Sequence, residues 1–122
     1  MDKISLHLNN LPKVLNDDGI YASPPSAEVI QNSIKFIQGL PTYYQKILDP
    51  EDCITATGHG TITIDWYYRK RFISVEIGNT KLGWYSDLPD GSNPSSDGIL
   101  LQDKPPAAII SALNMIYYRK DI

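Results

Sequence analysis

Two carboxylates and one histidine of this chain have the side-chain types that proton transfer requires. Asp65 and Glu76 occupy outward positions of two predicted neighbouring strands, where they would be diagonal neighbours roughly 6 to 8 Å apart. That separation resembles the acid and base pair of a glycosidase. His59, between two glycines, is free to transfer a proton or bind a ligand. Exposed carboxylates are routine on antiparallel sheets, so we favour a solubilising role for the pair and a simple turn at His59.

The remaining reactive residues lack the neighbours that chemistry would need. Cys53 has no basic residue close in sequence, and we interpret it as a small buried apolar side chain. No serine has the Gly-x-Ser-x-Gly context of a strained nucleophile. The Gly-His-Gly segment 58–60 lacks the lysine and hydroxyl residue of a phosphate-binding loop. His7, Cys53 and Asp65 do not match the ligand spacing of a metal site. The sequence therefore predicts no catalytic residue, no cofactor and no metal.

Length and composition are those of one folded domain. The chain has 122 residues, of which 42% are hydrophobic and 20% are charged, a balance typical of a folded soluble protein. A single cysteine gives no internal disulfide and favours a reducing compartment. No apolar run approaches the ~18 residues of a membrane span, and no signal-peptide core is present. We therefore predict one cytoplasmic domain, 1–122, that does not associate with membranes.

The net charge of −3 argues against general nucleic-acid binding, which normally requires a basic patch that displaces counterions from phosphates. Local cation clusters remain near Arg69 and Arg119. Each follows two tyrosines, so residues 67–70 and 117–120 have the same sequence, Tyr-Tyr-Arg-Lys. One copy lies at a predicted strand end and the other at a helix end. We therefore interpret the repeat as a coincidence, with cations that extend beside amphipathic rings.

The elements that position these groups are clearest in segment 54–87, where apolar and polar residues alternate in three consecutive strands. A short additional strand at 54–57 could precede them. The register that keeps the apolar residues on one face pairs Ile64 with Val75, Trp66 with Ile73, Val75 with Trp84 and Ile77 with Leu82. This register places Arg69 and Lys70 at the centre of the first turn. The segment is therefore predicted to be an antiparallel meander.

Two helices are predicted to cover the apolar face of the meander. The first, in segment 23–40, follows a Ser-Pro pair, has a broad apolar stripe and ends before Gly39. The second, 104–119, starts with Pro105 and Pro106, after Asp103. Its buried stripe consists of Ile109, Ala112, Leu113 and Ile116. Between the first helix and the meander, residues 41–52 could form one or two helical turns or a packed loop.

Two further segments have less regular patterns. Segment 88–98 is rich in proline, glycine, serine and aspartate and is predicted to be a mobile loop, followed by a short fourth strand at 99–101. Segment 1–22 has apolar spacings of both a strand and a helix, and Pro12 would interrupt the helix. We favour an N-terminal arm or edge strand there. An unpaired strand edge would allow a homo-oligomer to form through this arm.

These elements predict an α+β fold of two layers, in which a three- to four-stranded antiparallel meander has two main helices packed on one face. The run Gly-Thr-Ile-Thr-Ile-Asp-Trp at 60–66, with Val-Glu-Ile-Gly at 75–78 and Gly-Trp-Tyr at 83–85, resembles a pattern of small bacterial and phage proteins of unknown function. The resemblance covers 23–87, about half of the chain. It implies a helix, meander, helix order and a bacterial or phage origin, and it carries no assigned functional residue.

One surface of the predicted meander has the composition of a protein interface. Tyr67, Phe72 and Tyr85 are one position out of phase with the buried residues and should form an aromatic strip on the outer side. Aromatic residues and arginine are enriched in protein interfaces. The predicted partner-binding residues are Tyr67, Phe72, Tyr85, Arg71 and Glu76. Sheet-based RNA binders also stack bases on such rings, but the carboxylates nearby oppose this use. Alternatively, the N-terminal arm or the long loop covers the rings.

The sequence alone does not specify a function. The favoured hypothesis is a non-enzymatic protein-binding module of bacterial or phage origin. An antitoxin, an immunity protein, an inhibitor or an accessory subunit of a defence complex would fit, each with a protein as its partner. One alternative is a small-ligand or nucleotide-binding protein that uses the turn at 58–60 and the mobile loop. The other is a small hydrolase that uses Asp65, Glu76 or His59.

Overall fold

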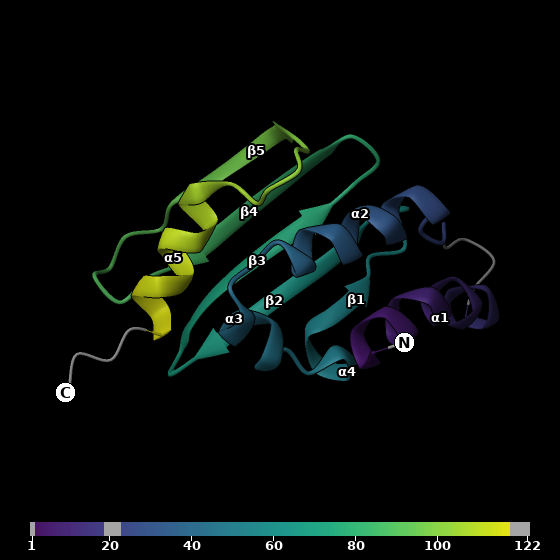
Figure 1. Cartoon of the computed structure of the whole chain (residues 1–122), viewed down its shortest axis with the longest axis horizontal. Helices are drawn as coiled ribbons and strands as arrows, with labels where there is room; N and C mark the ends of the chain where they lie inside the picture. The colour runs from purple at the N-terminus through teal and green to yellow at the C-terminus, as the bar shows by residue number, and fades with distance from the viewer. Residues whose placement is uncertain (1, 19–22, 118–122) are drawn as a thin grey trace.

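The protein has an α+β fold built on a five-stranded antiparallel sheet (Figure 1). The computed structural model describes residues 2–18 and 23–117, with the side chains of 2–12 and 23–117. In chain order the elements are α1 (Lys3–Asp18), α2 (Ala27–Gln38), α3 (Thr42–Lys46), α4 (Pro50–Cys53), β1 (Ile54–Ala56), β2 (Ile62–Tyr68), β3 (Arg71–Ile77), β4 (Lys81–Asp87), β5 (Ser95–Leu100) and α5 (Ala107–Tyr117). In the described part of the chain, no helix is long and apolar enough to cross a membrane.

The strands lie in the sheet in the same order as in the chain, β1-β2-β3-β4-β5, and each pairs antiparallel with the next. The four residue pairs predicted from the alternating pattern are confirmed. The number of strands is higher than the predicted three or four, because both the short β1 and the longer β5 join the sheet. A register irregularity between Leu82 and Trp84 interrupts the pairing of β4 with β5.

A two-residue turn joins β2 and β3. Tyr68 pairs with Arg71, which leaves Arg69 and Lys70 as the two central residues, as predicted. Their φ angles are +51° and +68°, so both residues have left-handed backbone conformations. Positive φ at both central positions is the requirement of a type I′ hairpin turn, whose usual residues are asparagine and glycine. Neither residue is found here.

The core lies between one face of the sheet and the helices α2, α3 and α5, which cover that face (Figure 1). Trp66 is 1% exposed, and its indole N–H donates to the backbone oxygen of Tyr44 (3.1 Å). The hydroxyl of Ser26 caps α2 by accepting from the Val29 N–H. The side-chain amide of Asn32 donates to the backbone oxygens of Gly78 and Asn79, and this fixes α2 against the turn between β3 and β4.

The N-terminal prediction of an arm or edge strand is wrong for the described residues, because Lys3–Asp18 is a helix with Pro12 inside it. The helical spacing places Leu8 and Leu11 on the same face of the helix, and both are buried in the core. An Asp2 carboxylate oxygen accepts from the Ser5 N–H (2.7 Å) and caps the first turn. Burial of the apolar stripe therefore outweighs the backbone hydrogen bond that proline removes. Residues 19–22 of the predicted arm lie outside the described residues.

The predicted loop 88–98 is also shorter than expected, because β5 begins at Ser95. The preceding turn is held by backbone hydrogen bonds from Leu88 to Ser92 and from Gly91 to Leu88, both 3.0 Å. The predicted fourth strand at 99–101 overlaps the end of β5. Its start was assigned to the loop because residues 95–98, Ser-Ser-Asp-Gly, have no apolar alternation and include Gly98 at φ +66°. The ambiguous segment 41–52 contains the short helices α3 and α4.

Candidate interface on the outer face of the sheet

The aromatic strip predicted from strand phase is continuous on the outer face of the sheet. Tyr67 and Phe72 are a cross-strand pair with ring centroids 6.2 Å apart. The Phe72 ring also makes an edge-to-face contact with Tyr85 across the next pair of strands, at 5.5 Å. The Tyr67 and Tyr85 side chains are 63% and 57% exposed. In the described structure the helices lie on the opposite face of the sheet, so none of them covers these rings (Figure 1).

The two charged residues predicted to flank the strip have partners within the fold. Arg71 donates from Nη1 to a carboxylate oxygen of Asp87 (3.3 Å). Glu76 accepts from the Thr61 hydroxyl (2.6 Å), which lies 2.7 Å from the hydroxyl of Thr57. By strand phase Glu76 lies on the outer face with the strip, whereas Arg71 lies opposite Tyr68, in phase with the buried residues.

The outer face carries more carboxylates than cations. Asp65, Glu76 and Asp87 point outward from β2, β3 and β4 by strand phase. The Asp97 carboxylate of β5 lies over Gly83, since one of its oxygens would be 2.6 Å from a Cβ atom at that position. The negative charge of Asp65 raises the pKa of the Tyr67 phenol, and partial burial of the ring and the nearby Tyr85 raise it further. The candidate interface is therefore an aromatic strip with an acidic surround.

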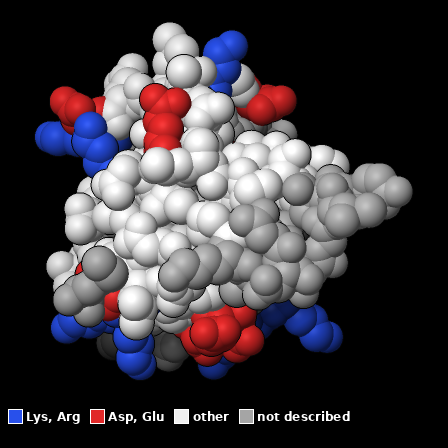
Figure 2. All heavy atoms as spheres, turned by 90° about the vertical axis from the view of Figure 1, so that its right-hand side faces the viewer, with Lys and Arg blue, Asp and Glu red and all other residues white. Residues whose placement is uncertain are grey.

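A different charge distribution is seen on the side of the molecule shown in Figure 2. There, Lys and Arg side chains alternate with Asp and Glu side chains at the upper and lower margins, and a broad area of uncharged described residues separates them. Among the described residues visible there, neither sign of charge dominates.

The residues considered for hydrolysis do not share a cavity. Asp65 accepts from the Ser74 hydroxyl, and Glu76 from Thr61. His59 lies in a turn whose two glycines have φ of +88° and +86°, and the turn is pinned to Ser23 by two backbone hydrogen bonds. None of the three side chains lines the cavities found among the described residues. Among those residues, no group of three or more His, Cys, Asp or Glu side chains is arranged to hold a metal ion.

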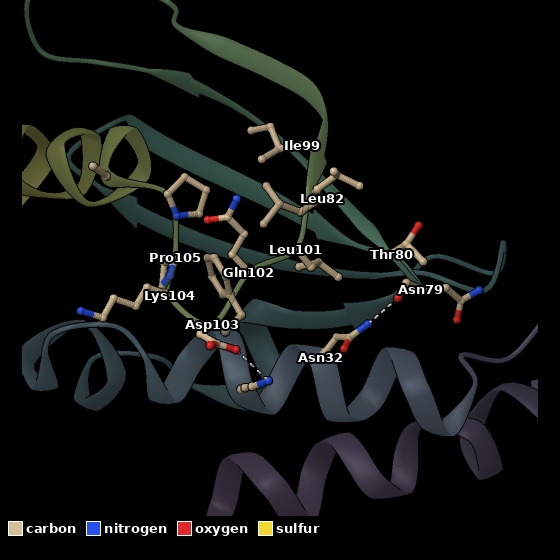
Figure 3. A pocket seen from close by; sticks show the side chains of 15 residues that line it. Asn32, Asn79, Thr80, Leu82, Ile99, Leu101, Gln102, Asp103, Lys104 and Pro105 are labelled. Atoms are coloured by element: carbon tan, nitrogen blue, oxygen red, sulfur yellow. Dashed lines mark hydrogen bonds and ion pairs between the residues drawn. The ribbon is translucent and has the colours of Figure 1, made fainter.

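Sequence reasoning missed a cavity of about 750 Å³ between α2, the start of β4, the end of β5 and the segment that leads into α5 (Figure 3). Its apolar wall includes Phe36, Leu82 and Leu101. Lys35 and Asp103, whose charged groups lie 3.5 Å apart, form an ion pair at its rim. These residues are separated by up to 68 positions in the chain, so no local pattern could have connected them.

A second cavity, of about 1090 Å³, lies between α1 and residues 45–51. His7 connects these elements, because its Nε2–H donates to the Ile54 oxygen (2.8 Å) and its Nδ1 is 3.8 Å from a carboxylate oxygen of Glu51. His7 is thus a structural contact between α1 and the start of the sheet.

Comparison of the chain with protein-family models, with curated proteins and with solved structures gave no match. The resemblance to small bacterial and phage proteins stays a prediction from the sequence.

Proposed function

We propose that this protein is a non-enzymatic protein-binding module whose interface is the outer face of the sheet. The observation that carries the proposal is the continuous aromatic strip of Tyr67, Phe72 and Tyr85, two of whose rings are more than half exposed. Covering the two tyrosines would remove on the order of 200 Å² from water, which corresponds to about 5 kcal/mol before the entropic cost of association. Exposed aromatic clusters of this kind are typical of interface hot spots.

The charges around the strip favour a partner with a basic contact surface. A lysine or arginine of the partner could pair with Asp65, Glu76 or Asp97, and an arginine could also stack on an exposed tyrosine ring. Complementary charge of this kind accelerates association and excludes acidic partners. An antitoxin, immunity protein, inhibitor or defence-complex subunit of bacterial or phage origin would use its surface in this way.

A small-ligand-binding protein is the second candidate function. The cavity of Figure 3 favours it, because an apolar wall with a few polar groups at the rim is the usual composition of a ligand site. The ligand would bind there and not at the turn 58–60, whose residues do not line the cavity.

The test begins with capture of the partner from the native host on tagged protein, followed by calorimetry with the purified partner. The double variant Tyr67→Ala, Tyr85→Ala should keep its circular dichroism spectrum and bind at least 30-fold more weakly, since the loss of even one hot-spot tyrosine costs about 2 kcal/mol. Tyr43→Ala is the matched control, because Tyr43 is 53% exposed on another part of the surface. Wild-type affinity in the folded double variant would refute the proposed interface.

The electrostatic part of the proposal is tested separately with Asp65→Asn, Glu76→Gln. This variant should slow association with the partner and reduce its dependence on salt. An association rate that is unchanged, or that increases, would mean that the partner is not basic.

A further inference from the structure

The two Tyr-Tyr-Arg-Lys sequences, which we interpreted as a coincidence, are in contact in the fold. Tyr68 at the end of β2 and Tyr117 at the end of α5 have ring centroids 5.3 Å apart. The Tyr117 hydroxyl donates to the backbone oxygen of Tyr67 (3.1 Å). The second residue of the first copy therefore packs against the first residue of the second copy, although 49 positions of the chain separate them.

Two tyrosines of α3 extend this contact into a four-ring cluster. Tyr43 lies 6.1 Å from Tyr117, and Tyr44 lies 5.8 Å from the same ring. Tyr44 is buried, whereas Tyr43 is 53% exposed and presents its ring to solvent. Figure 1 shows that α3, the turn between β2 and β3 and the last turn of α5 gather at one end of the molecule. We call this region the tyrosine end.

Two cations lie at the tyrosine end, in the turn between β2 and β3. The Arg69 guanidinium lies over the Tyr68 ring, 5.2 Å from its centroid. Arg69 and Lys70 are exposed, and none of the salt bridges among the described residues includes them. By contrast, Arg71 is paired with Asp87. The two positive charges of the turn are available to a ligand.

The hairpin turn itself favours a function for its cations. Arg69 and Lys70 have φ of +51° and +68°, conformations that side chains with a Cβ atom adopt at a cost. Asparagine and glycine would fit the same turn with less strain. The chain has two cations at the positions where hairpin stability alone would select other residues, and such strain is characteristic of functional sites.

We propose that the tyrosine end binds single-stranded nucleic acid, with phosphates on Arg69 and Lys70 and a base stacked on Tyr43. Proteins that bind single strands without sequence preference combine cations that contact the backbone with aromatic rings that stack on bases. An acidic protein would use the cations but would have no base to stack on Tyr43. The site adjoins the outer face at the turn that joins β2 and β3, but it does not depend on the partner proposed for that face.

Fluorescence anisotropy with a labelled single-stranded oligonucleotide of about 12 nucleotides tests the proposal, since this length covers a typical site. At low salt the wild-type protein should bind with Kd on the order of 10⁻⁴ to 10⁻⁶ M, and the affinity should fall as salt is added. Arg69→Asn, Lys70→Gly should weaken binding at least fivefold and reduce the slope of log K against log salt by about 1.4, the value for two phosphate contacts. Tyr43→Ala should weaken binding at least fivefold through lost stacking.

Matched controls come from the other parts of the surface. Lys81→Ala removes an exposed lysine near the opposite end of β3 and β4, and Tyr85→Ala removes an exposed tyrosine of the outer face; both should leave oligonucleotide binding unchanged. Poly-glutamate is the competing polyanion. The proposal is refuted if the wild-type protein does not bind the oligonucleotide at low salt, or if Lys81→Ala weakens binding as much as the turn variant. Equal affinity for poly-glutamate, unaffected by Tyr43→Ala, would likewise refute it and assign the end to an acidic protein.

Discussion

The strained turn between β2 and β3 predicts that a variant with less charge will be more stable than the natural chain. In Arg69→Asn, Lys70→Gly, the two left-handed positions at φ +51° and +68° receive the residues that type I′ turns favour. A left-handed conformation costs an ordinary residue about 1 to 2 kcal/mol, and the substitutions relieve most of this at both positions. The gross gain in the free energy of unfolding is therefore about 2 to 3 kcal/mol.

Two effects oppose this gain. Glycine gives the unfolded chain more freedom, which costs about 0.5 to 1 kcal/mol. Loss of the Arg69 guanidinium from the Tyr68 ring, where it lies 5.2 Å from the centroid, costs a similar amount, about 0.5 to 1 kcal/mol at an exposed site. The net result is a gain of about 1 kcal/mol, which corresponds to a rise in Tm of about 3 to 5 °C for a domain of this size.

Urea and thermal unfolding followed by circular dichroism measure the effect. The urea midpoint should rise with an unchanged m-value, because the substitutions alter stability and not the surface exposed on unfolding. Lys70→Gly is the informative single variant, since it relieves strain and keeps the contact of Arg69 with Tyr68. A midpoint that is unchanged or lower in both variants would show that the turn is not strained, and it would remove one argument for a function of its cations.

Two further predictions concern the core and the tyrosine end. Trp66→Ala should lower the free energy of unfolding by about 3 to 5 kcal/mol in urea titrations, because it opens a cavity under the helices and leaves the Tyr44 oxygen without its indole donor. Trp66→Phe should cost much less. A urea midpoint of Trp66→Ala close to that of the natural chain would mean that this face is not the core. Burial, with smaller contributions from Cys53 and the neighbouring tyrosines, raises the pKa of Tyr117 from 10.0 to about 12. Folding therefore favours the protonated form of Tyr117. The stability that results is fully present below pH 10 and is lost as the pH rises towards 12. Tyr117→Phe should lessen this alkaline decline in urea midpoint, and an identical decline in both proteins would show that folding does not raise the pKa of Tyr117.

The meander was predictable because two local rules determine it. Alternation of apolar residues assigns each strand a face, and the pleat then leaves one register for Ile64, Trp66 and their partners. The same phase argument placed Tyr67, Phe72 and Tyr85 together, since cross-strand neighbours follow from register alone. The aromatic strip of the candidate interface could therefore be predicted from the sequence.

The failed predictions depended on tertiary contacts. In α1, Pro12 indicates an interruption of the helix, but the burial of Leu8 and Leu11 in the fold outweighs this penalty. In β5, pairing with β4 stabilises a strand whose own residues have little preference for one. The tyrosine end combines residues from α3, β2 and α5, and their convergence depends on how the helices pack on the sheet. Sequence spacing carries no information about that packing.

Because the strands are arranged in the sheet in chain order, the sheet can grow one hairpin at a time while the protein is synthesised. The apolar face cannot be completed at the same pace, since α5 is made last. At about 5 to 20 residues per second, roughly 2 to 10 seconds separate the synthesis of Tyr68 from that of Tyr117, which covers it. During this interval the nascent chain exposes the part of the apolar face that α5 covers in the fold, and it is vulnerable to aggregation. Chaperones that bind exposed apolar surface would act on the nascent chain in this interval.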